Sequence, residues 1–327
     1  MSAPQRISRV RREYNQFVAN ETLEDYSLRF TAKSARKWSC GRVANTALGS
    51  ISFLALEAIG AAITLSYGFS NAVLAIAVVG LVIFLTGLPI SYYAARYGID
   101  MDLLTRGAGF GYLGSTVTSL IYASFTFIFF AIEAVILAMA LEMCFGIPLW
   151  VGYLVSALAI IPLVTHGITL ISRFQVWTQP LWIVLSLLPF VFIALHAPAE
   201  LSGWTAYLGK DGASATSLIA FGAAASVAFS LIAQIGEQVD FLRFLPPQEK
   251  VGRVRWWAAL LAAGPGWIVI GVLKLLAGSL LAFLALAHGV DADRAVEPTQ
   301  MYRIGFEYVF GSPAIALWVT GLFVVIC

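Results

Sequence analysis

The chain has 327 residues, of which 60% are hydrophobic and only 12% are charged, and its mean hydropathy is +0.84. A soluble domain carries about 25% charged residues, so this composition excludes an ordinary soluble protein. The net charge of +2 is too small to indicate a nucleic-acid partner. The cysteines Cys40, Cys144 and Cys327 form no CxxC pair and predict neither a disulfide framework nor a metal site.

Eight apolar runs follow a polar N-terminal segment. A helix needs about 20 apolar residues to cross the hydrocarbon core of a bilayer, and lipid offers no partners for backbone groups outside a helix. We therefore predict an all-α, polytopic membrane protein. The expected spans are residues 44–67, 71–95, 113–143, 149–167, 170–195, 214–239, 256–287 and 313–327. The last run is too short to cross, so we expect the sequence to be truncated in the eighth helix.

Lysine and arginine indicate the direction of these spans. Of the 20 Lys and Arg residues, 16 fall in alternate loops that share one side of a membrane, three fall in the opposite loops, and Lys274 lies inside an apolar run. Positive residues accumulate on the cytoplasmic side. We therefore expect residues 1–42 to form a cytoplasmic N-terminal arm and residues 43–327 to form a transmembrane domain. The amphipathic stretch Gln300–Phe310 is expected at the outer surface.

The first expected span runs from inside to outside, and the sixth runs the other way. Five helices are an odd number, so a second five-helix unit would be inverted in the membrane, as in many secondary transporters. Both spans are rich in small and hydroxyl-bearing residues, at Ala47–Phe53 and Phe221–Ser230. Such residues allow close helix packing in any membrane bundle, but their matched positions favour two helices that are broken near the midplane.

Three motifs carry a family resemblance. They are Gly87-Leu-Pro89 at the end of the second span, Leu103-Leu-Thr-Arg106 with Phe110-Gly111 and Gly114-Ser115 before the third, and Asp240-Phe-Leu-Arg243 at the end of the sixth. In this order and spacing the chain resembles the nucleobase–cation symporter-1 family of purine, cytosine, allantoin and hydantoin permeases. The resemblance implies a permease-like domain with a LeuT-type inverted five-helix repeat. It also implies symport of a nucleobase-like heterocycle with H⁺ or Na⁺. The sequence has no GxSxG, HExxH or Walker-type motif, so no enzyme activity is predicted for these residues.

The chain also resembles the permease-like N-terminal portion of some bacterial sensor histidine kinases. That second resemblance implies an alternative function, a transporter-like sensory domain that detects a small molecule and is followed by a kinase module beyond Cys327. In either case we expect a multi-pass protein of the bacterial inner (plasma) membrane with a cytoplasmic N-terminus. The expected partners are the bilayer and a small heterocycle, and no nucleic acid.

Two acids and one base inside apolar spans are the strongest candidate site residues. Glu133 lies in the otherwise apolar run Ile128–Leu141, where a carboxylate costs about 2.5–3.5 kcal/mol. We expect it to bind a ligand N–H or a proton, or to be a structural acid paired with Lys274. Phe129, one turn away on the same face, suits a flat ligand. Glu57 is also expected to pair with Lys274, in a structural or gating role.

The resemblance adds further positions. In the family the substrate lies between helices one, three, six and eight, and Phe129, Phe130 and Glu133 match the spacing of the third-helix residues. Many relatives have Trp where Phe129 stands and Gln or Gly where Glu133 stands. The expected substrate-binding residues are Phe53, Glu57, Phe129, Phe130, Glu133, Ser230 and Gln234. Gly49 and Ser52 are expected to bind the coupling cation, for which Na⁺ is one of the two candidates. A gating or structural role is expected for Arg106, Asp240, Arg243 and Lys274. No catalytic residue, metal site or other cofactor is predicted.

Overall fold

The computed structural model describes residues 30–165, 167–210, 212 and 216–327. Most of the arm predicted at residues 1–42 therefore lies outside the described residues. The described residues fold into helices, and the β pairing among them is one isolated bridge between Phe30 and Ile99.

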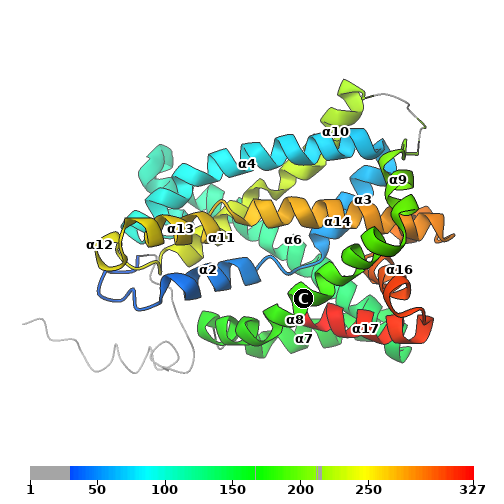
Figure 1. Cartoon of the computed structure of the whole chain (residues 1–327). Coiled ribbons are helices and arrows are strands. Elements are labelled where there is room, and N and C mark those ends of the chain that lie inside the picture. Colours follow the sequence, from blue (N-terminus) through cyan, green and yellow to red (C-terminus); the bar gives the residue numbers. More distant parts are fainter. Residues whose placement is uncertain (1–29, 166, 211, 213–215) are drawn as a thin grey trace, which may run out of the picture.

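The helices lie side by side in an elongated bundle (Figure 1). The short helix α12 (Gln248–Val251) lies at one end of the bundle, and α9 (Pro198–Thr205) and α16 (Pro298–Phe310) lie toward the other (Figure 1). The loops predicted on opposite sides of a membrane are thus at opposite ends of the molecule.

The apolar helices match the predicted spans. Among the described residues, five helical units are long and apolar enough to cross a membrane. They are α4 (Phe69–Tyr97), Met101–Phe145, α8 (Gly167–His196), Leu218–Leu242 and Arg253–Ala287. Shorter apolar helices are α3 (Ala55–Tyr67), α7 (Leu149–Thr165) and α17 (Pro313–Ile326). This arrangement confirms the predicted all-α, polytopic membrane class.

The third span begins earlier than its hydropathy predicts, at Met101 instead of residue 113. It consists of α5 (Met101–Thr105), a π-helical turn (Arg106–Phe110) and α6 (Gly111–Phe145). The Asp100 side chain accepts a hydrogen bond from the Leu103 amide at 2.9 Å and caps the first turn. Gly109 has a φ of 108° in the π turn, a conformation that glycine adopts without a steric penalty. The segment expected as a loop is therefore helical.

The first span is broken, as predicted. Helix α2 (Cys40–Gly49) is separated from α3 by residues 50–54, which are not helical. Ser39 caps the start of α2 by accepting a hydrogen bond from the Arg42 amide at 3.1 Å. The chain makes a turn within the break, in which the Ser52 amide donates a hydrogen bond to the Gly49 carbonyl at 3.2 Å.

The sixth span differs from the prediction of a second broken helix. Helices α10 (Leu218–Phe229) and α11 (Gln234–Leu242) are joined by one 3₁₀ turn, Ser230–Ala233. A 3₁₀ turn tightens the helix but keeps its backbone hydrogen-bonded, so small residues here change the pitch without releasing the chain.

A break that the sequence analysis missed lies in the seventh span. Helix α13 (Arg253–Ala263) and helix α14 (Trp267–Ala287) are separated by Gly264, Pro265 and Gly266. Proline lacks a backbone N–H and cannot continue the hydrogen-bond ladder of α13. The bend redirects the chain before α14, which then packs along α3.

Helices α3 and α14 approach each other closely at two glycines. A Cβ atom added to Gly60 would overlap the Leu275 carbonyl oxygen, and one added to Gly278 would overlap the Glu57 carbonyl. Small residues allow this kind of backbone approach in membrane bundles. One turn farther along, the buried Thr64 hydroxyl donates to the Ser279 hydroxyl at 2.7 Å.

We expect Gly60→Ala and Gly278→Ala each to destabilise the protein by about 1–3 kcal/mol, because the added methyl forces the two helices apart. The measurement is thermal unfolding of the purified protein in detergent. Gly222→Ala is the matched control, since a Cβ at that helical glycine meets no atom within 4 Å. Equal stability of all three variants would contradict the close packing of α3 on α14.

Candidate functional site

The break in the first span is capped by an acid from the third span. The Glu133 carboxylate accepts a hydrogen bond from the Ala55 amide at 2.7 Å. Ala55 is the first residue of α3, where the backbone N–H groups of a helix lack internal partners and carry partial positive charge. One of the two roles predicted for Glu133 was pairing with Lys274, but Lys274 pairs with Glu57 instead. The Glu133 carboxylate anchors α3, the second half of the broken span.

Aromatic rings lie beside this cap. The ring centroids of Phe53, in the break, and Phe129, on α6, are 5.5 Å apart in an edge-to-face arrangement. Phe125 adds a third ring, 4.3 Å from Phe129. Phe129 and Glu133 lie one turn apart on the same face of α6, so the acceptor and the aromatic surface both meet the break.

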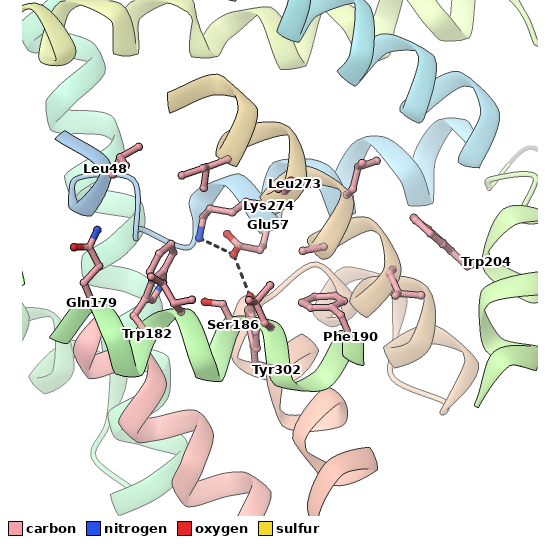
Figure 2. A pocket seen from close by; sticks show the side chains of 16 residues that line it. Leu48, Glu57, Gln179, Trp182, Ser186, Phe190, Trp204, Leu273, Lys274 and Tyr302 are labelled. Carbon is pink, nitrogen blue, oxygen red and sulfur yellow. Dashed lines mark hydrogen bonds and ion pairs between the residues drawn. The ribbon is translucent and has the colours of Figure 1, made fainter. Parts of the chain in front are cut away.

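A buried ion pair holds the other side of the break. The Lys274 ammonium on α14 lies 2.7 Å from Oε1 of Glu57, and the two side chains are 8% and 1% exposed. The pairing predicted between them is therefore present. The Tyr302 hydroxyl of α16 donates to the same Glu57 oxygen at 3.1 Å. Figure 2 shows Glu57 held between the Lys274 and Tyr302 side chains.

Lys274 has two further neighbours. Its ammonium donates to the backbone carbonyl of Ser52 in the break at 3.4 Å, and it lies 5.3 Å from the ring centroid of Trp182 on α8. A cation over the face of an aromatic ring is attracted by the ring's quadrupole. The three groups around Lys274 thus come from the break (Ser52), α3 (Glu57) and α8 (Trp182).

A cavity of about 560 Å³ adjoins the ion pair. Figure 2 shows its lining side chains, with Trp182, Ser186 and Phe190 of α8 on one side and Leu273 and Lys274 of α14 on the other. Most of the lining is apolar, and the charged groups lie at the edge nearest the break. The cavity therefore borders the Glu57–Lys274 ion pair and is not a separate polar site.

The sixth span contacts the break through α11. The Gln238 amide donates to the Ser50 hydroxyl at 3.4 Å, and the buried Gln234 donates to Oε2 of Glu237 at 2.7 Å. Gln234 therefore lies on the helix that contacts the break, and its predicted role in substrate binding stays a prediction. Ser50 and Glu237 were not among the predicted residues, although the spacing of Gln234, Glu237 and Gln238 on one helix could have indicated them.

Two predicted substrate-binding residues lie elsewhere. Phe130 is 41% exposed, because its position next to Phe129 turns it away from the break. Ser230 is also exposed, and its hydroxyl donates to the Val227 carbonyl of its own helix at 2.7 Å. Neither residue is brought to the cluster that contains Glu57, Glu133 and Phe53.

The residues predicted for the cation are held within the break. The Gly49 carbonyl accepts from the Ser52 amide, and the Ser52 hydroxyl donates to the Cys327 carbonyl at 2.9 Å. No group of three or more His, Cys, Asp or Glu side chains that could hold a metal ion occurs in the described part of the chain.

The remaining gating or structural candidates lie where α11 meets the start of the third span. Arg106 pairs with Asp102 at 2.7 Å across one helical turn. Asp240 interacts with the Tyr122 hydroxyl, the Met101 backbone and the charge of Arg243. These contacts join α11 to the start of the third span, which fits the predicted structural or gating role without testing it.

Tyr302 and Trp182 are further site residues that sequence reasoning did not find. Tyr302 belongs to the amphipathic stretch expected at the outer surface, yet it is 1% exposed. Its ring centroid lies 4.3 Å from that of Phe323 of α17. The amphipathic pattern of this stretch did not indicate which acid the Tyr302 hydroxyl would reach.

We expect Lys274→Met to lower the free energy of unfolding by about 3–5 kcal/mol, because it leaves the buried Glu57 carboxylate without its partner. The double variant Glu57→Gln/Lys274→Met should recover most of that loss. The free energies are measured by denaturant titration in mixed micelles. Lys210→Met removes an exposed charge and serves as the control. Additive losses in the double variant would show that the two groups do not interact.

Comparison with known proteins places this geometry in a known fold. No family model and no curated protein matches the chain. Among solved structures, the chain is similar to Mhp1, a nucleobase-cation-symport-1 family transporter, solved in a closed conformation with bromovinylhydantoin bound. The TM-score is 0.59 with 14% sequence identity, over 92% of this chain and 74% of Mhp1. The chain therefore shares the fold of this transporter.

Proposed function

We propose that this chain belongs to the nucleobase-cation-symport-1 family and transports a nucleobase-like heterocycle by symport with a cation, H⁺ or Na⁺. The proposal includes a multi-pass location in a bacterial inner membrane with the N-terminus in the cytoplasm. Three features support it: the shared fold, the broken first span, and the buried charges beside the break.

The observation that carries the proposal is the convergence of an acceptor and aromatic rings on the break. Glu133 reaches the first turn of α3, and Phe53 and Phe129 lie edge to face next to it. A flat heterocycle binds well between aromatic surfaces and a hydrogen-bond acceptor, because its faces are apolar and its edge carries N–H groups. This set of groups is suited to such a ligand.

Glu133 can serve the helix and the ligand together. An ionised carboxylate has two oxygens and about four acceptor positions. Its hydrogen bond to Ala55 uses one of them, so a heterocycle N–H can approach the same group. Ligand binding and the stability of the break would then be linked, which is the kind of coupling that an alternating-access transporter requires.

We expect Phe129→Ala to raise the KM for transport about tenfold, because it removes a ring that faces the break, and Phe130→Ala to change it by no more than about twofold. The measurement is counterflow of radiolabelled purines, pyrimidines and hydantoins in proteoliposomes that contain the full-length protein. Phe130 is the matched control, because it has the same side chain as Phe129 but faces away from the break.

The same assay separates transport from the sensory alternative. Saturable exchange of any tested heterocycle supports symport. Saturable binding of a heterocycle without exchange would instead favour a domain that detects the ligand, and the absence of both would contradict the proposal.

A further inference from the structure

The break in the first span already contains a cation. The Lys274 ammonium contacts a carboxylate oxygen of Glu57 at 2.7 Å and the backbone carbonyl oxygen of Ser52 at 3.4 Å. A carboxylate and a carbonyl freed from helical hydrogen bonding are the oxygen ligands that a hard metal cation takes. Here both are engaged by one amine.

The ammonium is held in this place by the packing of its helix. Gly60 and Gly278 bring α3 and α14 into backbone contact on either side of the pair. Lys274 is only 6% exposed, and Trp182 lies across from it at 5.3 Å. Moving the side chain out of the break would leave the buried Glu57 charge unpaired, which is strongly unfavourable.

The acids near the break are also already engaged. Two of them, Glu57 and Glu133, lie close enough to Lys274 to interact with it electrostatically. Glu133 accepts a hydrogen bond from the amide at the start of α3, and Oε1 of Glu57 is paired with Lys274. A metal cation entering at the Ser52 carbonyl would meet the Lys274 ammonium, which already holds the nearest carboxylate oxygen.

We propose that Lys274 is the resident cation of the first-span break, and that Na⁺ does not bind at the Gly49–Ser52 segment of this chain. This inference rests on the proposed function. If Na⁺ does not bind in the break, H⁺ is the coupling ion that remains for symport through this site. It also reassigns the predicted cation-binding role of Ser52, whose carbonyl binds the ammonium of a side chain and not a metal ion.

The test is thermal unfolding of the full-length protein in detergent, with NaCl compared to choline chloride at equal ionic strength. The unsubstituted protein should show no Na⁺-specific change in Tm. Lys274→Ala removes the amine and leaves Glu57 and the Ser52 carbonyl, so it should gain a saturable, Na⁺-specific rise of about 3 °C or more at about 100 mM Na⁺. Lys274→Arg keeps the positive charge and should stay indifferent to Na⁺.

If Lys274→Ala does not fold, the unsubstituted protein still decides the test, because a resident ammonium and a bound Na⁺ predict opposite responses to Na⁺. Glu57→Gln/Lys274→Ala removes both charges and should be indifferent to Na⁺, as a variant with no carboxylate for the metal. A saturable Na⁺-specific rise in Tm of the unsubstituted protein would overturn the proposal, and so would a folded Lys274→Ala variant without any Na⁺ response.

The readout contains no substrate, so it is independent of the transport assay. If no heterocycle is exchanged or bound but the Na⁺ responses follow the expected pattern, the proposed function fails and the assignment of Lys274 stands. If exchange is observed and depends on Na⁺ that also raises the Tm of the unsubstituted protein, the function stands and the assignment fails.

Discussion

The arrangement depends on the contact between α3 and α14. Gly60 and Gly278 remove the side chains that would hold these helices apart, and the close approach places Lys274 opposite Glu57. In a membrane, helix association gains little from the hydrophobic effect and depends on packing and interhelical polar contacts. This interface combines backbone approach at the glycines with the hydrogen bond from Thr64 to Ser279 and an ion pair.

A broken helix in a membrane needs partners for the backbone groups that it releases. Two other spans supply such backbone partners here, and a third contacts a side chain in the break. The third span provides Glu133 for the start of α3, the seventh provides Lys274 for the Ser52 carbonyl, and the sixth places Gln238 against Ser50. The break is therefore a junction of several helices, and a change in any of them reaches the same five residues.

Hydropathy and charge placement were sufficient to predict the spans, because lipid imposes the same length and composition on every crossing helix. The pairing of Glu57 with Lys274 was also predictable, since few charged residues occur inside the apolar runs. The cap made by Glu133 was not, because a backbone amide leaves no sequence signal. Phe130 was predicted by family spacing and Ser230 from the hydroxyl-rich stretch of the sixth span, and neither signal reports the face a side chain occupies. The 3₁₀ turn of the sixth span and the burial of Tyr302 depend on tertiary packing.

The second half of the broken first span, α3, packs directly on α14. Disulfide formation between Thr64→Cys and Ser279→Cys tests this packing most directly, in a background where Cys40, Cys144 and Cys327 are replaced by serine. The hydroxyls of the native pair are 2.7 Å apart, so this account predicts efficient cross-linking on mild oxidation. Thr64→Cys with Leu273→Cys, on the exposed side of α14, should not cross-link. Failure of the first pair, or equal cross-linking of both, would contradict the account.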